Sequence, residues 1–404
     1  MSVNLNLNPQ YLARRGMMRA GGLFVHLWKP PPLDAVRRVV LIRPDHLGDL
    51  LMLTPALARL RKALPDVDVS LYVDPSSCPV AFNGPEGIAV EAHCFPGITR
   101  GPKPHPVRPY VDLWFMARHL REGNYDAALI LRPDHWWGGG TAGVARIPLV
   151  LGFDHRDTRP ALTQALPFVP RMHAARANLL LIEALIARAT GQPPRALPVD
   201  DTALMATHPM VFRVPEAARV KAAALLNGWG LDTPLIAINP SAGAPVKRWL
   251  PERWAQVADA LAARYGAAIV LTGAPGDESL TGAVAVAMTH PALDLTGKTD
   301  FPTLGAVYER SALVLGPDCG SLHFAVAVRT PTVHLYGPAD VAQYGPWGDP
   351  ARHVAITADR RDIPCLGCGD LSLSRPPAPP CLTILEVVDI LAVADRLLAL
   401  PCAR

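Results

Sequence analysis

The apolar run Val39-Val40-Leu41-Ile42 is followed directly by Arg43-Pro44-Asp45-His46-Leu47-Gly48-Asp49. Four consecutive apolar residues without alternation predict a strand buried on both faces, as in a parallel sheet. Leucines then recur at helical spacing, at Leu50, Leu53, Leu57, Leu60 and Leu64. Thr54-Pro55 either begins this helix or kinks one that starts at Gly48. A strand, a tight turn and a helix in this order are the unit from which α/β folds are built.

The same unit recurs in two series along the chain. Further buried strands are predicted at Val69–Val73, Ala127–Leu131, Leu149–Phe153, Leu235–Ile238, Ala268–Leu271, Leu313–Leu315 and Thr332–Leu335. A helix is predicted over Pro251–Tyr265, and a polar, proline-rich stretch near residues 191–201 separates the two series. We therefore expect an α/β protein with two doubly wound parallel sheets. In such folds ligands bind beyond the carboxyl ends of the strands, here in a cleft between the two domains.

The composition narrows the class of protein. The chain has 404 residues, of which 50% are hydrophobic and 18% charged, which excludes general disorder. Its 43 prolines are about twice the usual share. A net charge of +4 is too small to indicate a nucleic-acid partner, and we expect none. The basic residues within 1–38 and the acid-free stretch Pro96–Tyr110 form either solvated loops or a face for phosphate or an anionic membrane.

The lack of a recognisable targeting signal and the number of cysteines lead us to expect a cytoplasmic protein. No apolar run approaches the roughly 18–20 residues that span a bilayer, and the short patch Gly21–Trp28 lacks a cleavage site. Seven cysteines, an odd number, fit a reducing compartment. Cys365-x2-Cys368 and Cys381 offer three thiolates where a structural zinc usually needs four. Free or buried thiols are therefore favoured, and whether these cysteines bind metal stays open.

Two identical tetrads follow two separate strands. They are Arg43-Pro44-Asp45-His46 and Arg132-Pro133-Asp134-His135, and we expect both at the carboxyl edge of one sheet. Asp49 stands shortly after the first tetrad, near a helix N-terminus whose dipole and amides would keep it ionised. An ionised carboxylate in a cleft can act as a general base. The alternative is that Asp49 only caps the helix.

The residues after the second tetrad indicate a ligand site less clearly. Trp136-Trp137 suit either stacking on sugar rings or the core. Gly138–Gly143 formally matches the dinucleotide fingerprint, with Asp154 and Asp157 further on, which would suggest an NAD-linked oxidoreductase. The fingerprint needs its glycines in the strand-to-helix turn, and here six residues separate them from the strand. We therefore keep that function only as a minor alternative.

The second series carries two candidate anion sites. Asn239–Gly243 with Lys247 predicts a phosphate cradle or an ordinary polar loop. Gly316–His323 opens an apolar helix, whose first amides favour a pyrophosphate, while Asp318 would accept hydrogen bonds from sugar hydroxyls or merely cap the turn. Cys319 is a weak candidate nucleophile, with His323 as its base. No Walker lysine motif is present, and Asp277 and Glu278 are candidate ribose partners.

The chain ends in an amphipathic pattern. Thr383-Ile384-Leu385-Glu386 reads as a capping box, and apolar residues then recur on one stripe to Leu398. We expect a terminal helix within residues 383–404 that packs back on the N-terminal domain. The other expected boundaries are an extension over residues 1–35, an acceptor domain over 36–212 and a nucleotide-sugar domain over 213–382.

Together these motifs resemble glycosyltransferase family 9, the heptosyltransferases of lipopolysaccharide core assembly. The similarity runs from about Val39 to Leu398. The family's opening strand with Gly-Asp matches Val39–Asp49, and its Thr-Pro-Ala-Leu matches Thr54–Leu57. Its central and late motifs match Pro240–Trp249, Asp318–His323 and Tyr336–Asp340.

The resemblance implies a GT-B fold, two Rossmann-like domains facing a cleft. It implies an inverting transfer, without metal or other cofactor, from a nucleotide-sugar such as ADP-heptose. The acceptor would be a lipid-linked or other saccharide at the inner face of the cytoplasmic membrane, with peripheral contact to that surface.

The resemblance also implies roles for individual residues. Asp49 would be the general base. The substrate-binding positions would be Gly48, Ser241, Ala242, Lys247, Asp318, Cys319, Gly320, Ser321 and His323. Within this set, Ser241, Ala242 and Lys247 would bind the donor phosphates, Asp318 the donor sugar, and Gly320, Ser321 and His323 the pyrophosphate. A weaker acceptor side would comprise Asp45, His46, Arg132, Asp134 and His135.

Two departures from the family pattern concern the late motif. Pro317 stands where the family commonly has Asn, and Cys319 where it has Ser or Thr. Proline lacks a backbone donor and a thiol is a weak one. The alternative function is therefore a divergent GT-B protein that binds a nucleotide-sugar or saccharide without transfer.

Overall fold

The computed structural model describes residues 35–96, 98–99, 105, 107–229, 232–358 and 379–400. Contacts group the chain into two compact units. The first takes residues up to 46, 56–170 and 176–197, and the second takes 47–55, 171–175 and 198 onward. The expectations for residues 1–34 and for the Cys365-x2-Cys368 pair lie outside the described residues, as do those for Arg100 and Lys103.

The first unit is built on a parallel sheet whose described strands run in the order β3-β2-β1-β4-β5-β6. They are β1 (Arg38–Arg43), β2 (Asp68–Val73), β3 (Ala89–Ala92), β4 (Ala127–Ile130), β5 (Leu149–Phe153) and β6 (Gln164–Leu166). In the register, Leu41 of β1 pairs with Leu71 on one side and Leu129 on the other. Every residue of β1 after Arg38 is buried, which confirms the strand predicted from its apolar run.

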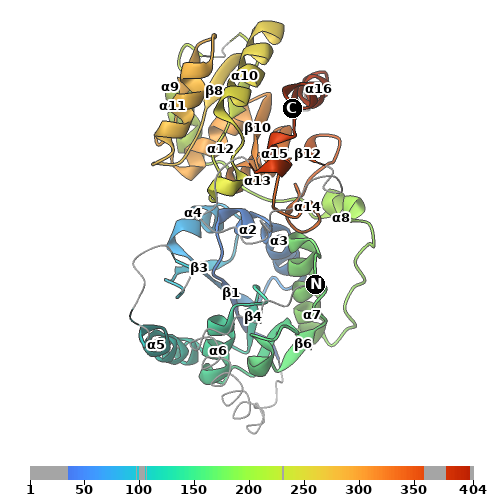
Figure 1. Ribbon diagram of the computed structural model, residues 1–404. Coiled ribbons are helices and arrows are strands. Elements are labelled where there is room, and N and C mark those ends of the chain that lie inside the picture. The colour runs from blue at the N-terminus through green and yellow to red at the C-terminus, as the bar shows by residue number, and fades with distance from the viewer. Residues whose placement is uncertain are drawn as a thin grey trace. The chain divides into compact units, whose positions relative to one another are not determined.

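Helices flank this sheet (Figure 1). In chain order the helices of this part of the chain are α2 (Leu47–Leu51), α3 (Thr54–Ala63), α4 (Cys78–Phe82), α5 (Arg108–Glu122), α6 (Trp136–Ala145) and α7 (Ala174–Thr190), with 3₁₀ turns η1 (Pro75–Ser77) and η2 (Arg159–Ala161). Of these, α2 belongs by its contacts to the second unit. The leucine-rich segment after β1 is thus two helices. The Thr54 hydroxyl donates to the Leu51 carbonyl (2.7 Å) at the break between them.

The run Gly138–Gly143 lies inside helix α6 and not in a strand-to-helix turn. A Cβ at Gly138 would stand 2.5 Å from His135 Nδ1 and 3.1 Å from the Ile42 side chain. A missing side chain therefore lets α6 approach the sheet closely. The dinucleotide fingerprint is a coincidence of packing, and the oxidoreductase alternative loses its only support.

The second unit repeats the topology, in the order β12-β11-β10-β7-β8-β9, with all the described pairs parallel. Its strands are β7 (Leu235–Ile238), β8 (Ala268–Leu271), β9 (Ala292–Asp294), β10 (Leu313–Pro317), β11 (Thr332–Tyr336) and β12 (His353–Thr357). In both units the first strand lies beside the fourth, which is the doubly wound order 3-2-1-4-5-6. The strand order therefore reverses between β1 and β4, and again between β7 and β10. Ligands of such folds bind at these switch points.

The helices of the second series include the predicted helix over Pro251–Tyr265 and the predicted apolar helix that follows Gly316. They are α8 (Asp201–Thr207), α9 (Glu216–Leu225), α10 (Pro251–Tyr265), α11 (Glu278–Ala287), α12 (Phe301–Arg310), α13 (Gly320–Ala327), α14 (Val341–Tyr344), α15 (Pro380–Thr383) and α16 (Val387–Leu398), with the 3₁₀ turn η3 (Pro245–Lys247). Helix α10 has the predicted bounds. Among the described residues no helix has both the length and the apolarity that crossing a membrane requires.

The C-terminal helix corrects the expected position of the capping box. Thr383 ends α15, and α16 is capped instead by Glu386, whose extended backbone starts a capping box with Asp389. Helix α16 buries Ile390, Leu391 and Leu397 in the core of the second unit. The reason is its apolar stripe, which completes a core cluster that α10 leaves open on that side.

Candidate active site

The switch point of the second sheet brings the two predicted anion sites together. The Asn239–Gly243 segment follows β7, and Asp318 follows β10, its neighbour in the sheet. A Cβ at Gly316 would stand 2.5 Å from the Asn239 carbonyl oxygen, so only glycine permits this approach. The sequence predicted both segments, and the sheet order places them side by side.

Asp318 is the centre of this site. Its carboxylate is 5% exposed, accepts a hydrogen bond from Lys247 Nζ (2.6 Å) and lies 3.6 Å from His323 Nε2. Burial raises the pKa of the Asp318 carboxyl, but His323 and Lys247 outweigh it and lower the pKa to about 2. The group is therefore an anion at neutral pH, held between two nitrogen groups. The Lys247 ammonium that was predicted to bind phosphate is here paired with Asp318.

The N-terminus of α13 faces the same edge of the sheet. The amides of the first residues of a helix have no acceptor within the helix, so Gly320 and Ser321 offer donors here. The Ser321 hydroxyl is hydrogen-bonded to the buried hydroxyl of Tyr308, which also contacts Thr272 Oγ1 (3.0 Å). Tyr308 thus fixes the Ser321 side chain. No pattern in the sequence distinguishes it from the other apolar-face residues of its helix.

Helix α2 packs against α13 within the second unit. A Cβ at Gly320 would stand 3.1 Å from the Gly48 backbone nitrogen, and one at Gly48 would stand 3.4 Å from the His323 ring. The two glycines allow the backbones to touch. Asp49, half-buried in the first turn of α2, therefore lies next to the helix that begins with the predicted substrate-binding residues Gly320, Ser321 and His323.

The loop after β7 is held by its own polar groups. The Ser241 amide donates to Asn239 Oδ1 (2.9 Å), and the Arg248 guanidinium donates to the Ala242 carbonyl (3.3 Å). Ser241 and Ala242 are both buried. Arg248 also lies 3.5 Å from Asp277, so that carboxylate, one of the two candidate ribose partners, has a cationic partner in the protein.

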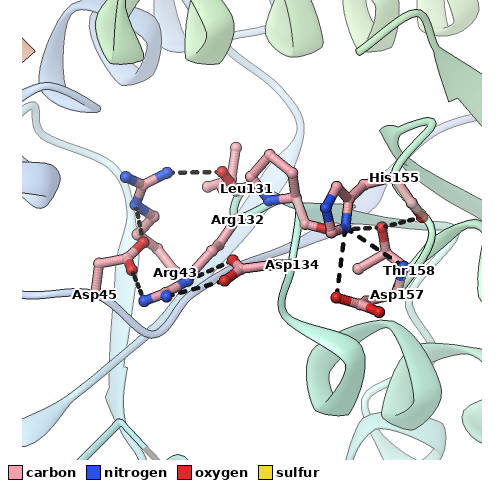
Figure 2. A network of polar contacts seen from close by, with 9 residues as sticks. Arg43, Asp45, Leu131, Arg132, Asp134, His155, Asp157 and Thr158 are labelled. Atoms are coloured by element: carbon pink, nitrogen blue, oxygen red, sulfur yellow. Dashed lines mark hydrogen bonds and ion pairs between the residues drawn. The ribbon is translucent and has the colours of Figure 1, made fainter. Parts of the chain in front are cut away.

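The switch point of the first sheet carries the two tetrads, and Figure 2 shows how they meet. The Asp45 carboxylate lies 2.8 Å from Arg43 Nε and 2.6 Å from Arg132 Nη1, and Arg132 also binds Asp134 through two hydrogen bonds. Arg43 further donates to the Leu131 carbonyl (2.7 Å). The prediction that the tetrads share one edge is confirmed. Arg43, which the site prediction omitted, is an integral part of the network.

The charges of this network are balanced within the protein. Burial lowers the pKa of Arg132, but Asp134 and Asp45 raise it more, so the net shift is upward. Arg132 therefore stays charged, and both arginines are already paired with a carboxylate. A ligand anion at this edge would have to share or displace Asp45 or Asp134.

The comparisons with known proteins agree with this geometry. The pattern of the family described as "Glycosyltransferase family 9 (heptosyltransferase)" matches residues 113–371, more than half of the chain. This chain belongs to glycosyltransferase family 9.

Individual members of the family support the same assignment. Lipopolysaccharide heptosyltransferase 3 of Escherichia coli is 27% identical over 362 residues, covering 87% of this chain and 96% of that protein. The glycosyltransferase family 9 structure from Veillonella parvula superposes with a TM-score of 0.70 at 24% identity, covering 91% of this chain and 98% of that one. The E. coli ADP-heptose lps heptosyltransferase II gives 0.68 at 18% identity, covering 89% and 98%. These two structures confirm the predicted GT-B fold.

The two histidines of the predicted acceptor side differ in this family 9 glycosyltransferase. His46 is exposed, whereas His135 is buried between Phe95 and Trp137. Burial lowers the pKa of His135 to about 4, so its ring is neutral at pH 7. Neither ring nitrogen has a hydrogen-bond partner among the described residues. As placed, His135 belongs to the packing beneath the tetrads, and Trp137 likewise lies in the core.

Cys319 does not have the environment of a nucleophile. It is half-buried at the N-cap of α13, and burial raises the pKa of its thiol to about 12. Only a thiolate is strongly nucleophilic, and at neutral pH this group stays a thiol. The structure thus agrees with a transferase that uses no covalent intermediate on this cysteine.

His334 is a polar residue of this site that the sequence analysis overlooked. It is fully buried in β11, its Nε2 contacts Thr332 Oγ1 (2.9 Å), and its ring centroid lies 5.6 Å from that of His323. Burial holds its pKa well below the ordinary value. The signal that could have found it is a histidine in the middle of the apolar run Thr332–Leu335.

Proposed function

We propose that this enzyme transfers a heptose from an ADP-activated donor to a lipopolysaccharide core saccharide or a related acceptor. Relatives named as lipopolysaccharide heptosyltransferases support the acceptor class, and the name of the E. coli structure supports ADP-heptose as donor. The observation that carries the proposal is the group formed by the half-buried Lys247 with the buried Asp318 and His323 at the N-terminus of α13.

The donor pyrophosphate would bind at the N-terminus of α13. The amides of Gly320 and Ser321 point donors at that edge, and the helix dipole favours an anion there. Lys247 and His323 add nitrogen donors, while Ser241 and Ala242 supply the wall after β7. Because Lys247 is held by Asp318, donor binding would let the ammonium turn from that carboxylate to a phosphate. Asp318 would then accept hydrogen bonds from the hydroxyls of the sugar.

Asp49 would act as the general base, without a metal ion. The acceptor hydroxyl loses its proton to the Asp49 carboxylate and its oxygen attacks the anomeric carbon. The bond from that carbon to the phosphate oxygen breaks, and the electron pair leaves with the nucleoside diphosphate. Attack opposite the leaving group inverts the anomeric centre. The α13 amides and Lys247 stabilise the charge that develops on the leaving group.

The competing function is binding without transfer. Pro317 ends β10 and has no backbone N–H to offer, and the Cys319 thiol is a weak donor. Both stand at positions where the family has stronger donors. A protein that kept the fold but lost these donors would bind a nucleotide-sugar and not turn it over.

Donor binding and turnover separate the two functions. Titration calorimetry with ADP, UDP and GDP is expected to show the tightest binding for ADP. Incubation with ADP-heptose and a heptose-deficient lipopolysaccharide acceptor is expected to release ADP only when the acceptor is present. Binding without acceptor-dependent release would favour the divergent protein, and no affinity for any of the three nucleotides would refute both.

The Asp49→Asn variant tests the base. Asparagine caps a helix as well as aspartate does but cannot take a proton. We expect kcat to fall by about 10²–10⁴-fold with donor affinity unchanged. The matched control is Asp201→Asn, since Asp201 is also a half-buried acid in the first turn of a short helix, α8. If Asp49→Asn keeps full turnover, Asp49 is only a cap and the base lies elsewhere.

We also propose that the enzyme works in the cytoplasm and touches the membrane surface through helix α5. Val107, Val111, Trp114 and Phe115 recur at helical spacing and are exposed, the last two by 61% and 64%. Arg118 and Arg121 continue the same face. Exposed aromatic side chains beside arginines are typical of helices that lie in a bilayer interface.

Vesicle co-sedimentation tests this surface. Phe115→Ser is expected to weaken binding to vesicles with anionic lipid, and Phe82→Ser is the control, because Phe82 is 65% exposed in the same unit but on α4. Neither variant should shift the melting temperature, since both side chains are largely in water. Equal binding by the two variants would refute the role of α5.

A further inference from the structure

A cluster of metal-ligating side chains lies at the edge of the first sheet, on elements that the proposed transfer does not use. Glu91 is on the edge strand β3, His93 follows the end of that strand, and His119 is on helix α5. One ligand atom from each lies within 4.8 Å of the others. We propose that Glu91, His93 and His119 bind a divalent zinc-class metal ion that joins β3 to α5.

Two of the three ligand-to-ligand distances are close to those of a tetrahedral site. His119 Nε2 lies 3.1 Å and His93 Nε2 lies 3.7 Å from the same oxygen, Glu91 Oε2. Ligands that bind zinc at about 2.0–2.1 Å in a tetrahedron are separated by about 3.3 Å. Small rotations of these side chains would therefore bring all three atoms to bonding distance.

The backbone and one aromatic ring hold the ligands in place. Glu91 and His93 are two residues apart at a strand, so their side chains point to the same face. The His93 amide donates to the Val73 carbonyl (2.8 Å), which extends the pairing with β2. The Tyr72 ring stacks on His93 at 4.7 Å and meets the His119 ring edge-on at 6.1 Å. Both imidazole rings therefore pack against the Tyr72 ring.

The ligand types select the metal. Two imidazoles and one carboxylate suit zinc and its transition-metal neighbours, whereas magnesium and calcium prefer oxygen ligands. The cluster is open to solvent, with the His119 side chain 51% exposed. Water can therefore supply the fourth ligand and the ion can enter without unfolding.

The position of the cluster indicates a structural role. β2 separates β3 from β1, so the cluster lies away from the switch point of the sheet. Its ligands come from both ends of the segment 93–119. A bound ion would close this segment into a loop and fasten α5 to the sheet edge.

Zinc titration of the full chain tests the proposal. The chain, freed of metal by a chelator, is titrated with Zn²⁺ in the calorimeter, and α5 is followed by hydrogen exchange. We expect one tight zinc equivalent and slower exchange in α5 on binding. Magnesium should produce neither effect. His119→Ala should weaken zinc binding by more than about 100-fold, because removing a ligand costs more than removing a supporting partner.

Two control variants make the result specific. His290→Ala removes a histidine that also lies 3.1 Å from a carboxylate, that of Asp259, but has no third metal ligand within the part of the chain that the structure describes. This variant should bind zinc as the parent does. Cys365→Ser with Cys368→Ser removes two of the three other candidate ligands, the pair with zinc-site spacing, and should also keep the tight site. If zinc binds only weakly, or is lost in the cysteine variant and kept in His119→Ala, the proposal is wrong.

Discussion

The charge of Asp318 contributes to the stability of the second unit, and the Asp318→Asn variant measures this contribution. The carboxyl is buried, and its pKa falls from the ordinary 3.8 to about 2. At about 1.4 kcal/mol for each pH unit, this lowering corresponds to about 2–3 kcal/mol of folding free energy at pH 7. Loss of a partner from a buried ion pair leaves Lys247 uncompensated, which costs a comparable or larger amount.

The stabilisation by the Asp318 carboxylate should decrease as the pH falls. A carboxyl whose pKa is lower in the folded state than in the unfolded state stabilises the protein above the unfolded value, near 3.8. The stabilisation is lost as the pH falls through the folded value, near 2. The difference between parent and Asp318→Asn should therefore be constant from pH 7 to about 5 and roughly halved near pH 3.

Urea unfolding provides the assay. The transition is followed by tryptophan fluorescence, to which the buried Trp249 and Trp254 in the core of the second unit contribute, and the slope is compared between variants. Asp395→Asn is the control, because Arg264 and Asp395 are also 2.6 Å apart but their side chains are 48% and 37% exposed. An exposed pair contributes at most about 1 kcal/mol. If Asp318→Asn costs no more than Asp395→Asn, or costs the same at pH 3 as at pH 7, the reasoning is refuted.

Three further predictions follow from the packing and burial of single residues. Gly282→Ala should raise the free energy of unfolding by about 0.4–1 kcal/mol, because a Cβ there meets nothing within 4 Å in helix α11, and a lower melting temperature would contradict this. Gly320→Ala should lower kcat by about tenfold or more, since its Cβ would press on the Gly48 backbone and shift α2, and unchanged turnover would show that the contact is dispensable. Iodoacetamide at pH 7 should label the exposed Cys94 but not Cys319, whose thiol pKa is raised to about 12, and equal labelling of the two peptides in mass spectrometry would refute that environment.

The central strands could be predicted from the sequence, whereas the edge strands could not. Val39–Ile42, Leu235–Ile238 and Leu313–Leu315 are apolar throughout, because a central strand of a parallel sheet is covered on both faces. β3 and β9 are only three or four residues long and nowhere fully buried. An edge strand needs no continuous apolar run, so its sequence resembles a loop.

In the candidate site, too, the sequence predicted single residues but not the contacts between them. Motif and spacing were enough to select Asp49, Lys247, Asp318 and His323, since each follows a predicted strand. They could not show that Lys247 binds Asp318, because 71 residues separate the two in the chain. The same holds for Tyr308, which reaches Ser321 only because α12 packs beside α13.

By itself, the sequence determined the parallel α/β class, the resemblance to glycosyltransferase family 9 and the positions where polar residues leave the strands. These are local properties, since burial on two faces, helical period and turn chemistry are written in neighbouring residues. The tertiary structure alone decided which of these residues meet. It joined Arg43 and Arg132 through Asp45, and it buried His135 in the core. It also gathered Glu91, His93 and His119 from two elements. Such contacts depend on strand order and helix packing, which are set by the whole chain and by no single segment.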